Sequence, residues 1–245
     1  ALEDVCALIE YTNPDLIVLT GDVVYPVSFI TGTNDNLTSL KVVAGILERY
    51  KTPWTMAFGN HDAESCAAYS KSELCEFLES DELEYCLFER GPSDVSGMGN
   101  HIINVYNNDY TINSSIILID NGEYKNVFQI SGYREISQYQ TDWYVDSVTE
   151  INRFFNQTVQ SFIFYHVPSR EYEYAWKEYR SGDTENVEYF YGWANEKNEK
   201  ISCPDDDSPL FDAILELGST KGIFCGHNHL NDFSISYKGV RLTFG

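Results

Sequence analysis

Residues of metal-binding type follow several short apolar runs of the sequence. Near the C-terminal end, His227 and His229 come just after the apolar run 222–225. Histidine is the commonest metal ligand near neutral pH, because its neutral ring carries a free lone pair. In a regular strand the two rings would point to one face, whereas in a turn each ring could reach a different ion. Three further candidate ligands, each at the end of another apolar run, are Asp22, Asn60 and His166.

Helix and strand patterns alternate in the first part of the chain. Residues 2–9 have helical periodicity, and residues 16–19 form a continuous apolar run typical of a parallel strand buried on both faces. A second amphipathic helix is indicated around 40–50, and residues 54–58 are the next expected strand. This alternation predicts an α/β architecture with at least a partly parallel sheet.

The second part of the chain continues this pattern. Residues 169–207 are acidic, aromatic and without clear periodicity, and we expect an irregular surface segment there. His101 is expected to be a partly exposed structural residue at a strand start. We see no internal repeat or linker, so residues 1–245 are expected to form a single domain. The further expected strands are 101–106, 114–120, 161–165, 222–225, 233–237 and 240–244, and the further expected helices are 137–156 and 210–217.

The candidate ligands would meet at one edge of the sheet. In α/β proteins, sites form beyond the carboxyl ends of the strands. One carboxylate, one amide oxygen and three imidazoles suit Zn²⁺, Mn²⁺ or iron, whereas Ca²⁺ prefers oxygen ligands alone. Five ligands exceed the four of a tetrahedral zinc site, which suggests two ions with Asp22 bridging them.

Composition excludes some other functions. The formal net charge is −22, from 38 acidic and 16 basic residues, and this makes nucleic-acid binding through a basic face unfavourable. No apolar run approaches the roughly 20 residues that span a bilayer. Six cysteines permit disulfides but do not require them, so the compartment, whether secreted, endolysosomal or cytoplasmic, stays open.

The order of the motifs resembles the calcineurin-like metallophosphoesterase superfamily, and within it a branch related to purple acid phosphatases. The resemblance rests on Gly21-Asp22, on residues 59–65 (GNHDAES), on His166-Val167-Pro168 and on Gly226-His227-Asn228-His229. It implies a sandwich of two mixed β-sheets flanked by helices. It also implies two metal ions, with Asp22 bridging them, with Asn60, His166 and His227 completing one ion and with His229 binding the other.

The resemblance further implies hydrolysis of phosphate monoesters, in a phosphorylated small molecule or a phosphoprotein, with iron, zinc or manganese as cofactor. His61 would donate a proton to the leaving group, and Asp62 would orient the His61 ring. Tyr25 stands where purple acid phosphatases have a tyrosine that binds ferric iron, and whether it is a ligand here stays open. Phosphodiester hydrolysis and a catalytically silent interaction module are the alternatives.

One departure concerns the first metal motif of the superfamily. That motif lies on a strand before the first helix, whereas residue 1 already lies within the helical pattern. We therefore expect a preceding strand, and also a further C-terminal segment, outside residues 1–245.

Overall fold

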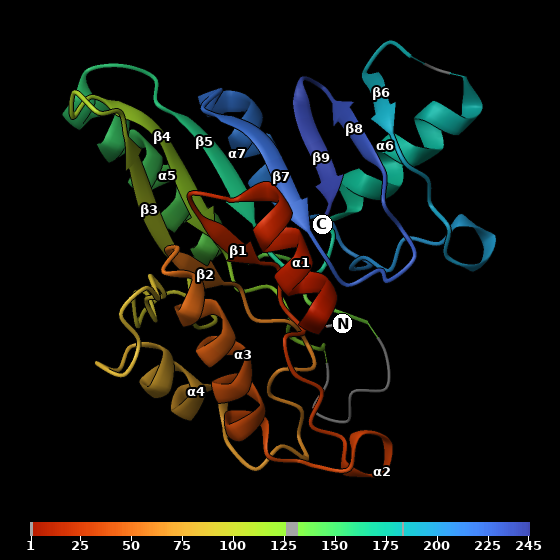
Figure 1. Cartoon of the computed structure of the whole chain (residues 1–245). Helices are drawn as coiled ribbons and strands as arrows, with labels where there is room; N and C mark the ends of the chain where they lie inside the picture. Colours follow the sequence, from red (N-terminus) through yellow and green to blue (C-terminus); the bar gives the residue numbers. More distant parts are fainter. Residues whose placement is uncertain (1, 126–131, 183) are drawn as a thin grey trace.

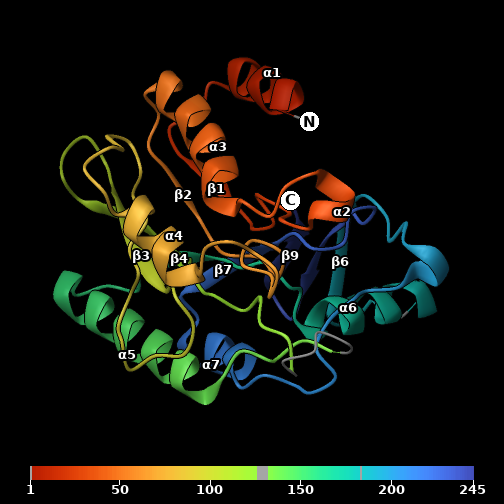
Figure 2. The same cartoon turned by 90° about the horizontal axis from the view of Figure 1, so that it is seen from below.

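The computed structural model of the chain describes residues 2–125, 132–182 and 184–245. Figure 1 and Figure 2 show its layers, with a small sheet and a large sheet lying between two groups of helices. The small sheet is parallel and consists of β1 (Ile17–Leu19) and β2 (Trp54–Met56). On its outer side lie α1 (Leu2–Thr12) and α3 (Asn36–Tyr50), with α4 (Lys71–Leu78) close by. The short helix α2 (Ser28–Thr31) lies between β1 and α3 in the chain.

The large sheet has seven described strands in the order β3-β4-β5-β7-β9-β8-β6. Its central strands β4, β5, β7 and β9 are parallel, while β3, β8 and β6 pair antiparallel with their neighbours. The carboxyl ends of the four central strands therefore lie at one edge. The strands are β3 (His101–Tyr106), β4 (Ile112–Leu118), β5 (Gln160–Phe164), β6 (Val187–Tyr191), β7 (Thr220–Cys225), β8 (Ser234–Tyr237) and β9 (Val240–Phe244).

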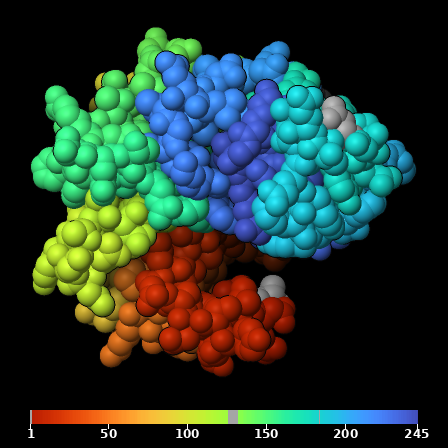
Figure 3. Space-filling model, turned by 90° about the horizontal axis from the view of Figure 1, so that it is seen from above, coloured from red at the N-terminus to blue at the C-terminus, as the bar shows by residue number. Residues whose placement is uncertain are grey.

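Three helices cover the face of the large sheet that is turned away from the small sheet. They are α5 (Gln138–Phe155), α6 (Arg170–Ser181) and α7 (Leu210–Leu217), and a short 3-10 helix, η1 (Lys197–Glu199), precedes α7. In Figure 3 the N-terminal residues, in red, form one side of the molecule, and the green to blue residues form the other. No helix within the described ranges is long and apolar enough to cross a membrane.

Alternation of side chains along β4 separates two apolar cores. Ile117 and Ile119 belong to the core between the large sheet and its helices. Ile116 and Leu118 point the other way and pack with Ala57 between the two sheets. Successive side chains of a strand face opposite sides of a sheet, so the continuous apolar run 116–119, at the end of β4, is suited to this central place.

The structure confirms the α/β sandwich and corrects several details. The small sheet is parallel over the described residues, whereas a mixed sheet was expected. Residues 169–207 are not irregular throughout, because α6 and β6 lie within them and β6 extends the large sheet. The buried residues of α6 include Tyr172 and Trp176, which are four positions apart, and this helical spacing was obscured by the acidic residues around it. The strand expected at 16–19 was predicted to be buried on both faces. In the structure β1 is only half-buried, since β2 is its single strand partner among the described residues. All six cysteines are free thiols.

His101 connects the two sheets and is buried, with 3% of its surface exposed, whereas partial exposure was expected. Its Nδ1 donates a hydrogen bond to the Gly99 carbonyl (2.9 Å), so Nε2 accepts one from the Thr55 hydroxyl on β2 (2.9 Å). This arrangement uses the neutral ring, and burial lowers the pKa of His101 to about 4.

Acid is therefore expected to destabilise the fold through His101. Above the unfolded-state pKa of 6.5 the ring is neutral in both states. As the pH falls from 6.5 toward 4, the unfolded chain binds a proton that the folded chain excludes, which removes up to about 3 kcal/mol of stability. Urea unfolding of the wild type and of His101→Gln between pH 7 and pH 4 measures this loss. The variant should lose less stability over that range, and parallel curves would contradict the prediction.

Candidate metal centre

Four strand ends bring their polar residues together. The ligand atoms of Asp22, His166 and His227 all lie within 4.8 Å of one another, after β1, β5 and β7 respectively. Asn60, after β2, joins them, since its Oδ1 lies 3.1 Å from His166 Nε2. The small sheet thus supplies Asp22 and Asn60, and the large sheet supplies the two histidines.

His166 Nε2 stands at the centre of this group. It lies 3.0 Å from Asp22 Oδ2 and 3.3 Å from His227 Nδ1. The other ring nitrogen, Nδ1, donates to the Thr20 carbonyl (2.7 Å), so in the neutral ring Nε2 carries a lone pair. Asp22 Oδ2, Asn60 Oδ1 and His227 Nδ1 thus all lie within 3.3 Å of this nitrogen.

This arrangement fits a cation. Asp22 Oδ2 is buried and, when the His166 ring is neutral, has no hydrogen-bond donor among the described residues, although a buried carboxylate oxygen normally has one. Two imidazole nitrogens, a carboxylate oxygen and an amide oxygen form a donor set suited to zinc, iron or manganese. The hydrogen bond from His166 Nδ1 to a backbone carbonyl is the support that metal-binding histidines usually have.

Burial and charge set the protonation of the group. Burial alone would raise the pKa of Asp22, but the contact with His166 lowers it below its ordinary value. Burial lowers the pKa of His227 to about 3, and the charge of His166 acts in the same direction. For His166, burial acts to lower the pKa, but the contact with Asp22 outweighs it and raises the pKa. A metal ion would therefore compete with a proton at His166 Nε2.

Two glycines permit the close approach of the turns. A side chain on Gly59 would collide with the carboxylate and the backbone nitrogen of Asp22. Gly21 has a φ of +90°, and a side chain there would collide with the His166 ring and the Gly59 backbone. The Gly-Asp and Gly-Asn-His-Asp motifs thus pack directly on each other.

His61 lies beside the metal group, but its ring partner differs from the one expected. Its backbone N–H donates to Asp22 Oδ1 (2.8 Å), and its Nδ1 lies 2.6 Å from Glu64 Oε1. The carboxylate of Asp62 was expected to orient this ring. Instead its two oxygens accept hydrogen bonds from the backbone N–H groups of three residues, namely Asp22, Val24 and Gly59.

The two remaining candidates are His229 and Tyr25. His229 is exposed and is not part of the group of three ligand atoms, so its role at a second ion stays a prediction. Tyr25 is 39% exposed, and its ring packs against the ring of His61 with centroids 4.4 Å apart. Tyr25 thus forms a wall of the site beside His61.

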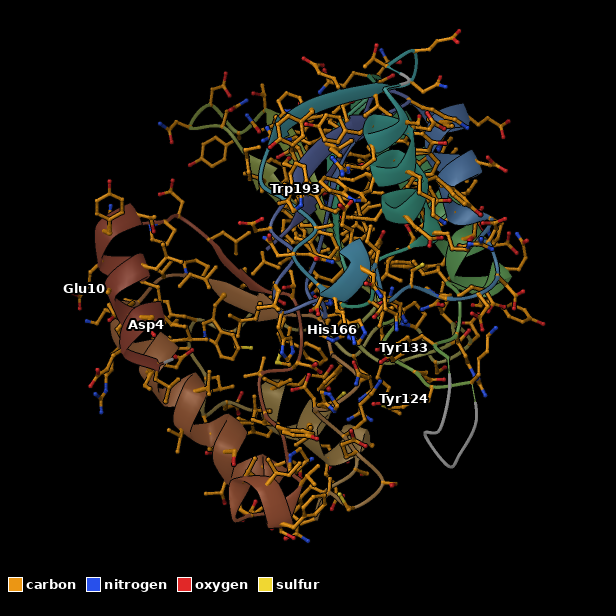
Figure 4. The ribbon with its side chains drawn as sticks, turned by 90° about the vertical axis from the view of Figure 1, so that its right-hand side faces the viewer. Asp4, Glu10, Tyr124, Tyr133, His166 and Trp193 are labelled. Atoms are coloured by element: carbon orange, nitrogen blue, oxygen red, sulfur yellow. The ribbon has the colours of Figure 1, made fainter. Side chains whose placement is uncertain are left out.

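Three residues of the site were not found from the sequence. Tyr124 accepts a hydrogen bond from Asn60 Nδ2 (2.7 Å). The Tyr133 ring packs edge-on against the His227 ring, with centroids 4.6 Å apart. Figure 4 shows both tyrosines near His166. Glu64 is the third, and the Tyr124 hydroxyl lies 3.5 Å from its Oε1. A hydrogen-bond chain therefore runs from His61 through Glu64 and Tyr124 to Asn60.

Comparison with known proteins defines the family. Residues 1–231 match the family model of the calcineurin-like phosphoesterases, and the chain belongs to this family. This confirms the resemblance drawn from the motifs.

Curated relatives include "Phosphatase DCR2" of Saccharomyces cerevisiae, which is 30% identical over 93% of this chain and 38% of its own length. "Probable inactive purple acid phosphatase 29" of Arabidopsis thaliana is 25% identical over 95% of this chain and 59% of its own length. The chain thus spans less than two thirds of the length of these relatives. A solved structure of a dimetal phosphatase from Danio rerio matches 99% of this chain and 76% of its own, with a TM-score of 0.60 and 12% identity, and it supports the fold.

The Tyr124 hydroxyl is expected to support metal binding by fixing the Asn60 amide. With Nδ2 bonded to Tyr124, Oδ1 must face His166. Loss of such a supporting hydrogen bond typically weakens metal affinity by about 10- to 100-fold, and we expect this for Tyr124→Phe. Competition of apo-protein with a fluorescent zinc chelator measures the dissociation constant.

Tyr133→Phe is the matched control for this prediction. It removes the same hydroxyl from the neighbouring ring, whose centroid lies 5.4 Å from that of Tyr124. The contact of Tyr133 with His227 is made by the ring, so the control should bind zinc like the wild type. Equal losses in the two variants would contradict the role of Tyr124.

Proposed function

We propose that the protein hydrolyses phosphate monoesters at a centre of two transition-metal ions, of iron, zinc or manganese. The observation that carries this proposal is the meeting of four lone-pair donors, Asp22, Asn60, His166 and His227, directly beside His61. The family to which the chain belongs acts on phosphoesters, and the Danio rerio protein of similar fold is a dimetal phosphatase.

The bound ions would supply positive charge that holds the phosphate oxygens and lowers the pKa of a water molecule. Asp22, with one oxygen in the cluster and one accepting from the His61 N–H, is the candidate bridge between the ions. His229 is the candidate ligand of the second ion. The two sheets would hold the ligands of the ions in fixed positions.

His61 is the candidate proton donor. Its Nδ1 faces the Glu64 carboxylate, which leaves Nε2 as the nitrogen that can deliver a proton to the leaving oxygen. The side chain of Glu64 is 8% exposed, and that of His61 is 28% exposed. The Glu64 carboxylate, 2.6 Å from Nδ1, thus holds the ring in this orientation.

Two alternatives are separated by experiment. The same ligand set also suits phosphodiesters, and "probable inactive" in the names of the plant relatives points to a catalytically silent module. Turnover of p-nitrophenyl phosphate and of bis-p-nitrophenyl phosphate should be measured with the full-length protein, before and after chelation and after addition of Zn²⁺, Mn²⁺ or Fe²⁺.

We expect the monoester to be the better substrate, activity to vanish with chelator, and His61→Ala to lose about 100-fold or more in kcat. A preference for the diester would favour the phosphodiesterase. Activity that survives both chelation and His61→Ala would overturn the proposal. A protein that binds metal tightly but hydrolyses neither ester would favour the silent module.

Glu64 provides a second prediction, which concerns proton donation to the leaving group. Glu64→Gln replaces the carboxylate that faces His61 Nδ1 with a neutral amide of similar size. Esters with poor leaving groups need the proton most, so we expect phenyl phosphate to lose about 10- to 100-fold in kcat/KM. 2,4-Dinitrophenyl phosphate, whose leaving group needs little help, should lose no more than about threefold.

Glu82→Gln is the matched control, because it changes an exposed carboxylate that lies 3.9 Å from Lys41 Nζ. It should leave both rates unchanged. An equal loss for both esters in Glu64→Gln would indicate that Glu64 only supports the local structure.

A further inference from the structure

A cavity of about 620 Å³ opens beside the metal cluster. Asn60, whose Oδ1 belongs to the cluster, lines it, and so does Tyr124, which holds the Asn60 amide. The phosphoryl group of a substrate would lie at the cluster, so this adjoining cavity is placed to receive the rest of the substrate.

The charges that line this cavity differ from those of the whole chain. The chain has 38 acidic residues against 16 basic ones, whereas the cavity is lined by three basic residues and one acidic residue. The basic residues are Lys71, Lys125 and Arg134, and the acidic one is Glu123. On the lining itself, basic side chains thus outnumber acidic ones, and this favours an anionic ligand there.

Carboxylates hold the two lysines in position, and these carboxylates lie outside the cavity lining. Lys71 Nζ donates to both oxygens of Asp120 (3.1 and 2.7 Å). Lys125 Nζ donates to Asp206 (2.7 Å) and lies 3.6 Å from Asp205 Oδ2. Asp120 and Asp206 do not line this cavity. An ammonium has three N–H donors, so each lysine keeps donor capacity beyond these contacts.

Arg134 is the most available of the three cations. Its side chain is 61% exposed, and its contact with Glu123 is a single long hydrogen bond of 3.4 Å. The guanidinium has five N–H donors, and its planar fork suits a carboxylate or a phosphate group.

We propose that this cavity binds a second anionic group, a carboxylate or a phosphate, on the leaving-group side of the substrate. The inference rests on the proposed function and extends it by naming the substrate class: phosphate monoesters that carry a further negative charge. Such a group would form charge-assisted hydrogen bonds with Arg134 and Lys125 while its ester phosphate lies at the metal cluster.

The test compares two substrates of nearly equal size, 4-carboxyphenyl phosphate and 4-carbamoylphenyl phosphate. The wild-type protein, loaded with metal, should prefer the carboxylate ester by about three- to tenfold in kcat/KM. This preference should fall with increasing salt, since exposed charges are screened. The double variant K125Q/R134Q should lose the preference and keep its rate on the carbamoyl ester.

Lys71 is left unchanged in this test, because its removal would leave the fully buried Asp120 side chain without its cation. The control variant is Lys221→Gln, which changes an exposed lysine near the start of β7, at the end of the strand opposite to His227. It should keep the preference. Loss of the preference in the control as well would assign the effect to net charge and overturn the inference.

Two sources of the second charge can be distinguished with further pairs of substrates. One pair is a phosphoserine peptide with a neighbouring aspartate and the same peptide with asparagine. The other is a hexose bisphosphate and the corresponding monophosphate. A preference for the charged member in either pair, abolished by K125Q/R134Q, supports the inference and identifies the source.

Failure of this inference differs from failure of the proposed function. Hydrolysis of both aryl esters at equal rates would overturn the anion subsite alone. Hydrolysis of neither ester by the metal-loaded, full-length protein would overturn the proposed function and this inference with it.

Discussion

The buried carboxylate of Asp62 holds together the two turns on which the candidate metal centre depends. Its oxygens accept hydrogen bonds from the backbone N–H groups of Asp22 (3.0 Å), Gly59 (2.7 Å) and Val24 (2.9 Å). The turn after β1 and the turn after β2 are thereby fixed to each other. Burial raises the pKa of Asp62 to about 6, and the charge of Asp22 acts in the same direction. Three N–H donors offset part of the cost of burying this charge, as expected for a buried carboxylate. Asp62 thus fixes the backbone of both turns.

The strand ends that carry the site were predictable from the sequence, because short apolar runs followed by Gly-Asp or Gly-Asn-His identify the carboxyl ends of buried strands. Which side chains touch within the site was less predictable. Tyr124 and Asn60 are 64 positions apart, and their contact depends on how the segment after β4 crosses the turn after β2. No local pattern reports such a contact. Glu64 could have been weighed against Asp62, since both carboxylates lie within three residues of His61. The choice between them depends on backbone geometry: the N–H groups of neighbouring turns occupy Asp62, and Glu64 is left to meet the ring.

Charge is distributed unevenly around the centre. The net charge of −22 gives the protein a negative field that opposes the approach of phosphate esters at low ionic strength. Cations near the site offset this field locally, and a bound metal pair would do so more strongly. Lys71 shows how such a cation is kept charged although its side chain is only 20% exposed. Burial acts to lower its pKa, but Asp120 outweighs burial and raises it. Acidic side chains in this protein therefore also serve to hold basic ones beside the site.

The division of the ligands between two sheets links metal binding to the stability of the sandwich. Asp22 and Asn60 come from the small sheet, and His166 and His227 come from the large one. Among the described residues, the apolar contacts between the sheets centre on a small group that includes Ala57, Ile116 and Leu118. The His101–Thr55 hydrogen bond adds a polar link. An ion held by all four ligands would bind the assembled sandwich more tightly than the unfolded chain. It would then stabilise the fold by an amount that grows with the logarithm of metal concentration. Such an ion would thus also hold the two sheets together at the end where their strands bring the ligands.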